Sequence, residues 1–168
     1  MSWGDITPIF GTDVNHNILG GISTINGSGI SDLALTVTLA QMASGNIGHA
    51  LGVATEFTCD YSVPPATHND GTATGLCIPE GARIQLDPSI DLATIPGITP
   101  FELAVGTALQ QYGAFVKDTS GDPMAISFQD ADDSGNGATW AQYGDPVDDY
   151  WTMPHIPWGA LRVLAFPS

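Results

Sequence analysis

The chain has 168 residues, 43% of them hydrophobic, and its 3 Lys and Arg residues against 18 Asp and Glu residues give a net charge of −15. This length suits one compact domain, and the negative field disfavours nucleic acid and acidic membranes as partners, unless the charge only maintains solubility. No stretch approaches the roughly 20 apolar residues of a membrane span, and the start MSWGDITPIF does not have the pattern of a signal peptide.

The 20 glycines and 12 prolines are spread between short apolar runs, which predicts many strands joined by turns. Residues 1–29 are rich in Gly, Asn, Ser and Thr, and we expect short strands or covering loops there. Alternation over residues 30–39 predicts a strand, followed by a helical turn that Gly45 ends. Residues 49–57 predict a second strand.

Residues 82–86 predict a short strand with Arg83 and Gln85 on one face and apolar residues on the other. One helix is predicted near residues 99–113. Thr99 supplies an N-cap hydroxyl, proline follows at the first helical position, and Glu102 can close a capping box.

Apolar runs at 114–117 and 124–128 flank turn residues and predict a hairpin, and the last apolar run predicts a final strand. One amphipathic helix among many strands predicts a mainly β fold, a jelly-roll-like β-sandwich, in which residues 1–168 form a single domain.

Cys59 and Cys77 are the only cysteines, and the residues between them are rich in turn formers. A disulfide between them would contribute roughly 3 kcal/mol and would favour an oxidising compartment. The alternatives are two buried free thiols or two ligands of a metal site, although the close spacing of zinc ligands is missing.

Several motifs together resemble a group of secreted, uncharacterised actinobacterial proteins. The matching pieces are GSGIS at 27–31, HAL at 49–51, PPATHNDGT at 64–72, IPEGARIQLDP at 78–88, TPFELAVGTALQQYGAFVKDTSG at 99–121 and PHIPWGALRVL at 154–164. The resemblance implies an extracellular or cell-surface protein and carries over no catalytic residue. Those relatives have further N-terminal strands, so we expect an open sheet edge here, covered by residues 1–29, by self-association or by a second chain.

The first candidate site is catalytic and consists of His68 and Asp70 in the PPATHNDG loop, with His49 and Arg83 as expected neighbours. A histidine oriented by a carboxylate suits acid–base catalysis or metal binding. A nearby arginine would neutralise a sugar carboxylate, as a polysaccharide lyase requires. The alternative is structural, because Asp70 is also an ordinary turn residue.

The second candidate site is a calcium loop, since Asp130, Asp132 and Ser134 occupy the first, third and fifth positions of an EF-hand-like pattern. The twelfth position is Ala141 and not glutamate, so the pattern is incomplete. A solvated acidic loop is the alternative.

The third candidate site is aromatic, since Trp140, Tyr143, Tyr150 and Trp151 lie among acidic and glycine residues, where exposed rings would stack on sugars. Trp140 and Trp151 are the rings expected at the surface, and Trp158 is expected in the core. The sequence therefore predicts an extracellular protein that binds polysaccharide or joins a surface assembly, with a polysaccharide lyase as the alternative. No cofactor other than calcium is indicated.

Overall fold

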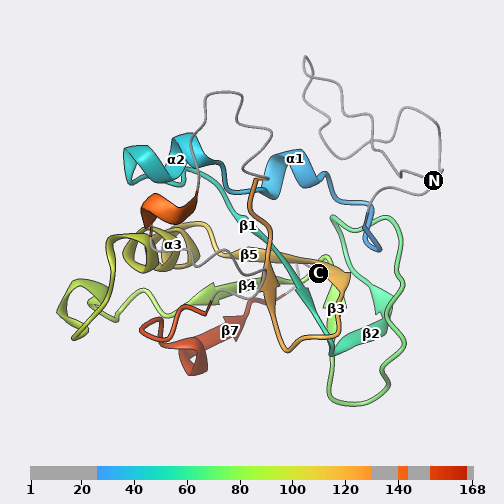
Figure 1. Ribbon diagram of the computed structural model, residues 1–168. Helices are drawn as coiled ribbons and strands as arrows, with labels where there is room; N and C mark the ends of the chain where they lie inside the picture. Colours follow the sequence, from blue (N-terminus) through green and yellow to red (C-terminus); the bar gives the residue numbers. More distant parts are fainter. Residues whose placement is uncertain (1–25, 130–139, 144–151, 166–168) are drawn as a thin grey trace.

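The computed structural model describes residues 26–129, 140–143 and 152–165, which form a mixed sheet with helices packed around it (Figure 1). The predicted Gly- and Asn-rich segment lies almost wholly outside these residues. The described helices include none that is long and apolar enough to cross a membrane.

The main sheet has five strands in the order β6-β1-β5-β4-β7, and a second sheet has two. The strands of the main sheet are β1 (Leu51–Thr55), β4 (Arg83–Leu86), β5 (Ala114–Thr119), β6 (Ala125–Ile126) and β7 (Leu161–Val163). The small sheet pairs β2 (Thr58–Ser62) with β3 (Ile78–Glu80) in parallel. In the main sheet β1 and β5 are parallel, and the other neighbours are antiparallel.

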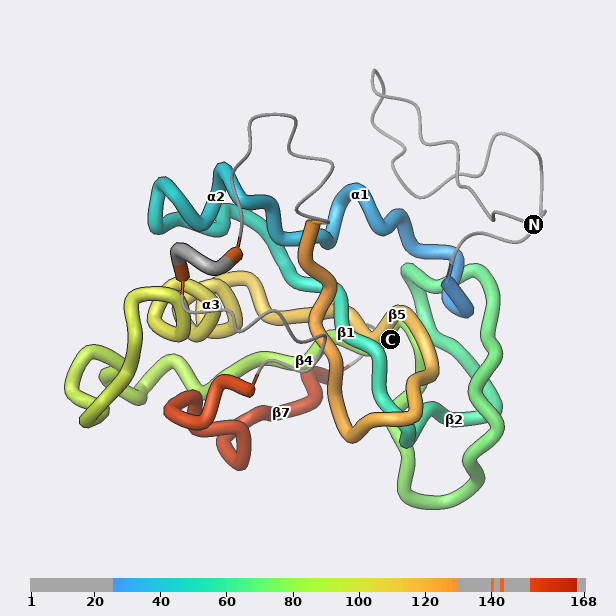
Figure 2. Tube along the Cα trace, viewed as in Figure 1, coloured from blue at the N-terminus to red at the C-terminus, as the bar shows by residue number. Residues whose placement is uncertain are grey.

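The helices are α1 (Asp32–Leu35), α2 (Leu39–Ser44) and α3 (Pro100–Gln111), with 3-10 turns at Leu92–Thr94, Trp140–Tyr143 and Trp158–Ala160. In Figures 1 and 2, α3 is drawn at one end of the sheet and the β2–β3 sheet at the other.

The core forms between α3 and one face of the main sheet. Residues paired across strands share a face, so the pairs Leu51 with Ala114 and Ile84 with Ala114 place these three side chains on the same side. All three are buried and belong to one cluster with the apolar residues of α3, among them Phe101 and Leu109.

The predicted helix is confirmed, and its local signals are visible in the structure. The Thr99 hydroxyl accepts from the Glu102 N–H, and the Glu102 carboxylate accepts from the Thr99 N–H in return. Gly113 follows the helix with a φ of 71°, a conformation that glycine adopts without steric cost. The strand predicted at 82–86 and the end of a short helix at Gly45 are also confirmed.

The strand predicted over residues 30–39 is wrong, because a helical turn forms there instead. The Thr36 hydroxyl and N–H both donate to the Asp32 carbonyl, which closes α1. Only Val37, fully buried, keeps a strand-like contact, an isolated parallel bridge to Phe128.

The hairpin predicted between residues 114–117 and 124–128 is also wrong, because β1 lies between β5 and β6. The turn residues at 118–123 do reverse the chain. However, both arms pair with β1 and not with each other, so a long-range strand has taken the place of the local partner.

The prediction of a mainly β fold is met only in part, because three helices accompany the two described sheets, and the jelly-roll sandwich is not confirmed. A jelly roll is built from antiparallel strands in two packed sheets. The described strands form one mixed sheet with a parallel central pair and one small parallel sheet, and the main sheet packs against α3.

Candidate acidic site

Three carboxylates from separate segments meet near the end of β5 where it lies beside β2 and β3. Asp70, Glu80 and Asp118 each offer an oxygen, and these oxygens all lie within 4.8 Å of one another. We call this set the acidic site. Asp70 is exposed, Asp118 is half-buried and Glu80 is fully buried, so the acidic site has a buried floor and an open side.

Glu80 is held at the floor by backbone pairing on both sides. It is the last residue of β3, it is paired with Ser62 of β2, and its carbonyl accepts the Val63 N–H at 2.8 Å. The next residue, Gly81, donates to Val116 of β5. These bonds fix the main chain of Glu80, and its side chain is buried with no exposed surface. Throughout the described chain, neither of its carboxylate oxygens has a hydrogen-bond donor.

Asp118 is directed by a bulge in the pairing of β1 with β5. Val53 is opposite Val116, but the next residue of β1, Ala54, is opposite Asp118 and not Lys117. Such an extra residue changes the direction in which the following side chains point, and bulges are frequent beside functional sites. Oδ1 of Asp118 then accepts the backbone N–H groups of Gly27 at 3.1 Å and Thr119 at 3.0 Å.

Asp70 reaches the other two carboxylates because its loop is bonded to neighbouring segments. The N–H groups of Thr67 and His68 donate to the Ser28 carbonyl, and the Ser28 N–H donates to Lys117 of β5. Oδ1 of Asp70 accepts from the Thr119 hydroxyl at 2.7 Å, and that hydroxyl also contacts the hydroxyl of Thr58.

A glycine allows the closest approach at the acidic site. A Cβ at Gly27 would overlap the carboxyl group of Asp70. The segment GSGIS therefore lies against the carboxylates, and a side chain at position 27 would prevent this close packing.

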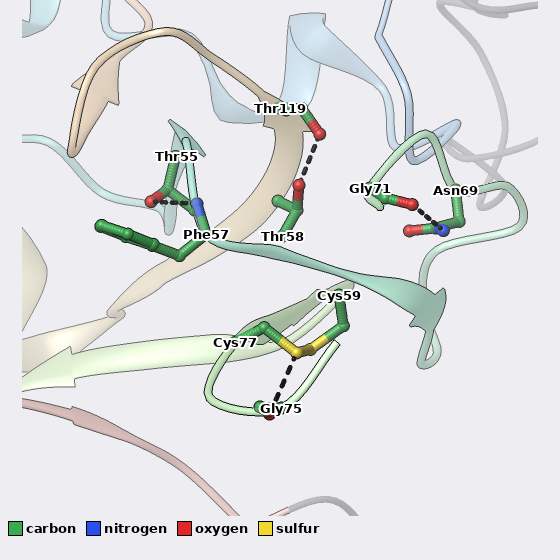
Figure 3. The surroundings of a disulfide bond; sticks show 9 residues. All are labelled: Thr55, Phe57, Thr58, Cys59, Asn69, Gly71, Gly75, Cys77 and Thr119. Atoms are coloured by element: carbon green, nitrogen blue, oxygen red, sulfur yellow. Dashed lines mark hydrogen bonds between the residues drawn. A yellow bond between two sulfur atoms is a disulfide. The ribbon is translucent and has the colours of Figure 1, made fainter. Parts of the chain in front are cut away.

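The disulfide between Cys59 and Cys77 is confirmed, with an S–S distance of 2.07 Å (Figure 3). It joins β2 to the residue before β3, at the two ends of the loop that carries Asp70. Asn69 in this loop donates to the Gly71 carbonyl at 3.2 Å, while its side-chain oxygen is buried without a partner among the described residues.

The protonation of the three carboxyls is uneven. Burial, and then the neighbouring Asp70, raise the pKa of Glu80 to about 8 from a usual value of 4.5. Burial also raises the pKa of Asp118. For Asp70, burial is outweighed by the protonated Glu80 beside it and by hydrogen bonding from Thr119, so its pKa is lowered. In the absence of a cation, Glu80 thus keeps its proton at neutral pH beside the ionised Asp70.

The acidic site therefore suits either one shared proton or one hard cation. All three side chains are oxygen donors, which are the ligands that calcium, magnesium and manganese prefer. A softer metal such as zinc would favour histidine or cysteine, and neither type contributes to this cluster.

The residues predicted as a catalytic group lie in two separate places. Asp70 is in the acidic site, and His68, two residues away, is exposed with its ring bonded to the Thr67 hydroxyl at 2.9 Å. Arg83 donates to the Tyr112 carbonyl, before the start of β5, and lies over the ring of Phe115.

His49 also lies toward the start of β5, because it precedes Leu51, the partner of Ala114, by two residues. Its ring Nδ1 is 2.8 Å from the neighbouring Ala50 carbonyl. Tyr112 and Asp118 are six residues apart, or about 20 Å along an extended strand. The structure therefore does not bring His49 and Arg83 together with Asp70.

The aromatic prediction for Trp140 is wrong, since this ring is 9% exposed and packs against Phe101 and Phe128. Its indole N–H donates to the Gln129 carbonyl, so the polar atom is satisfied inside the protein. Tyr143 is half-buried against Phe101 and Trp140. Trp158 is expected in the core, but its side chain is half-buried and packs against the core cluster.

The remaining predicted residues lie outside the described ranges. These are the aromatic residues Tyr150 and Trp151 and the calcium-loop residues Asp130, Asp132 and Ser134.

The sequence patterns do not identify Glu80 or Asp118 as site residues. Glu80 precedes the strand predicted at residues 82–86, and Asp118 is one of the turn residues that follow the apolar run 114–117, so both patterns predict only local structure. One signal is present, since Glu80 is an acid between proline and glycine in the otherwise apolar run LCIPEGA. With 18 acidic residues in the chain, that signal does not single it out.

Comparisons with known proteins add no relative. No family model matches the chain, and searches of characterised proteins and of solved structures find no significant match.

Proposed function

We propose that this protein is an extracellular domain that binds a divalent cation at the acidic site, with calcium as the first candidate. The observation that carries the proposal is the side chain of Glu80. It is fully buried, neither of its oxygens has a donor in the described structure, and it faces two further carboxylates. A buried charge of this kind is stable only if it is neutralised by a proton or paired with a cation.

Calcium fits the acidic site better than magnesium. Calcium accepts six to eight oxygen ligands in flexible geometry, whereas magnesium demands a near-ideal octahedron and keeps several of its waters. A buried glutamate at the floor suits an ion that sheds its water readily. Calcium sites of extracellular modules also operate at the millimolar concentrations found outside cells.

The charge distribution of the chain supports a cation. The net charge is −15, and the ammonium of Lys117, the only lysine, is paired with Asp32. Arg83 is bonded to Tyr112 at the other end of β5. The field therefore concentrates cations around the protein, and no basic side chain in the described residues pairs with the three carboxylates.

The extracellular part of the proposal rests on the disulfide and on the sequence resemblance to secreted proteins. A disulfide in a small domain is typical of an oxidising compartment.

Calcium titration with thermal unfolding tests the proposal. We expect calcium to raise the free energy of unfolding of the wild type by about 2.7 kcal/mol at 100 times Kd, and to have no such effect on Glu80→Gln or Asp118→Asn. Asp60→Asn is the matched control, because Asp60 is an exposed acid on β2 outside the cluster. A wild type that binds no calcium by calorimetry, or a control that loses binding as Glu80→Gln does, would overturn the proposal.

Polysaccharide binding is a second proposal, supported by exposed rings near the disulfide. Tyr61 on β2 is 54% exposed, and Phe57 just before β2 is 51% exposed.

Membership in a surface assembly, by self-association or with a second chain, would use the outer strands β6 and β7, which are the edges of the described sheet. The separation of His49 and Arg83 from Asp70 gives the lyase alternative no support.

A further inference from the structure

The three carboxylates of the acidic site do not by themselves complete the shell of a calcium ion. The hydrogen bonds found at Asp70 and Asp118 use Oδ1 of each, and neither oxygen of Glu80 has a donor in the described residues. One free oxygen on each aspartate and two on Glu80 make four. Calcium takes about six to eight ligands, so at least two positions must be filled from outside this set.

Among the described residues, the side of Asp70 is the open side of the acidic site, and the missing ligands can arrive there. Glu80 closes the floor of the acidic site with no exposed surface, and Asp118 is half-buried beneath the backbone of Gly27. Asp70 is exposed, and its loop neighbours Thr67 and His68 are exposed as well. A bound cation would therefore present its open coordination positions to solvent at this loop.

The charge around the acidic site decides which oxygen ligands fit. Three carboxylates and one divalent cation sum to 2 − 3 = −1. The whole chain carries −15, and no basic side chain of the described residues is bonded to the cluster. A ligand with its own carboxylates would be repelled by this field, whereas a neutral ligand with two adjacent hydroxyl oxygens would not.

We propose that the open side of the acidic site, once it holds calcium, binds neutral polysaccharide through a pair of adjacent sugar hydroxyls. This inference rests on the proposed function, because it requires the cation to be present. It names the ligand class as a neutral glycan with vicinal hydroxyls and not a uronate polymer. Each hydroxyl supplies one coordinating oxygen, and together they replace two water molecules.

The test measures calcium binding and glycan binding on the same full-length protein. Calorimetry reports the cation, and retention on immobilised mannan, dextran and xylan reports the glycan, each in calcium chloride and in EDTA. We expect retention in calcium and at least a tenfold loss in EDTA. Free methyl mannoside should compete for the retained protein, and polygalacturonate should retain it less than the neutral polymers.

Variants separate the acidic site from the rest of the surface. Asp70→Asn, which keeps one oxygen and its bond from Thr119, should lose glycan retention, whereas Asp60→Asn should retain glycan as the wild type does. Tyr61→Ala reports whether an exposed ring alone is responsible, and it should leave the calcium dependence of retention in place.

The outcomes are distinguishable. Calcium binding without any glycan retention would overturn this inference and leave the proposed function standing. Retention that EDTA does not change, or stronger retention on polygalacturonate, would also overturn it. A protein that binds no calcium would overturn the inference and the proposed function together.

Discussion

Glu80 places an ionisable group where water cannot reach it, and this makes the stability of the protein depend on pH. In the absence of a cation its pKa is about 8 in the folded state, against 4.5 for an ordinary glutamate. At pH values between these two pKa values, Glu80 holds a proton in the folded state that it has lost in the unfolded state. The contribution of Glu80 to the free energy of unfolding should therefore be largest below the lower value and be lost as pH rises toward the upper one.

Urea unfolding in EDTA from about pH 5 to about pH 8 checks this dependence. The wild type should lose on the order of 2–4 kcal/mol across this range, and the raised pKa of Asp118 acts in the same direction. Glu80→Gln carries no charge to bury, so its stability should change much less. Equal slopes for the two proteins would show that Glu80 does not cause the dependence.

Gly27 gives a second prediction for a single residue, concerning shape and not charge. Gly27→Ala would push a methyl group into the carboxyl of Asp70, and such overpacking costs typically 1–3 kcal/mol. Gly48→Ala is the matched control, since a Cβ there meets no atom within 4 Å. Thermal unfolding should show a lowered midpoint for Gly27→Ala alone. Equal midpoints would mean that the segment moves away from Asp70 without cost.

At the scale of elements, the disulfide fixes the two ends of the loop that carries Asp70. It closes a separation of 18 residues, so removing it should cost roughly 3 kcal/mol in the entropic model. We expect Cys59→Ala with Cys77→Ala, and the wild type after reduction, to unfold at similarly lower urea concentrations. If the double variant matches the oxidised wild type, the crosslink is not a source of stability.

The capping box of α3 predicts a smaller effect at a defined place. Thr99→Ala removes the hydroxyl that accepts the Glu102 N–H, and loss of such a cap costs about 1 kcal/mol. Thr107→Ala lies inside the same helix, away from its caps, and should be neutral or slightly stabilising because alanine has the higher helix propensity. A cap variant as stable as the interior variant would contradict the prediction.

The contrast between α3 and the β5–β6 region explains which elements could be predicted from sequence. The boundaries of α3 depend on Thr99, Glu102 and Gly113, all local in the chain, so they are visible in the pattern. The turn between β5 and β6 is equally visible, but the strand that separates them, β1, comes from about 60 residues earlier. Turn residues show that the chain reverses and do not identify the partner strand.

The same distinction applies to the acidic site. Asp70 was predicted because it lies in a conspicuous polar loop, although its expected partners were His49 and Arg83. Its actual neighbours depend on the pairing of β2 with β3 and on the bulge opposite Ala54 in β5. Neither feature has a local signature, so Glu80 and Asp118 could be recognised only in the folded chain.

At the scale of the whole molecule, the net charge of −15 opposes folding by self-repulsion, and this effect must be separated from the acidic site. Ions screen exposed charges at any position, with a Debye length of roughly 10 Å at 0.1 M ionic strength. Sodium chloride should therefore raise the unfolding midpoint of the wild type and of Glu80→Gln in parallel, since both keep the same acidic surface.

Calcium should differ from sodium at equal ionic strength, and only in the wild type. Screening predicts similar gains for both proteins in each salt, whereas occupation of three converging carboxylates predicts an extra, saturable gain that needs Glu80. Thermal unfolding in matched series of calcium chloride and sodium chloride measures this difference. If the calcium curve of Glu80→Gln lies as far above its sodium curve as that of the wild type, calcium acts on the acidic surface in general, and the convergence of Asp70, Glu80 and Asp118 serves to share a proton.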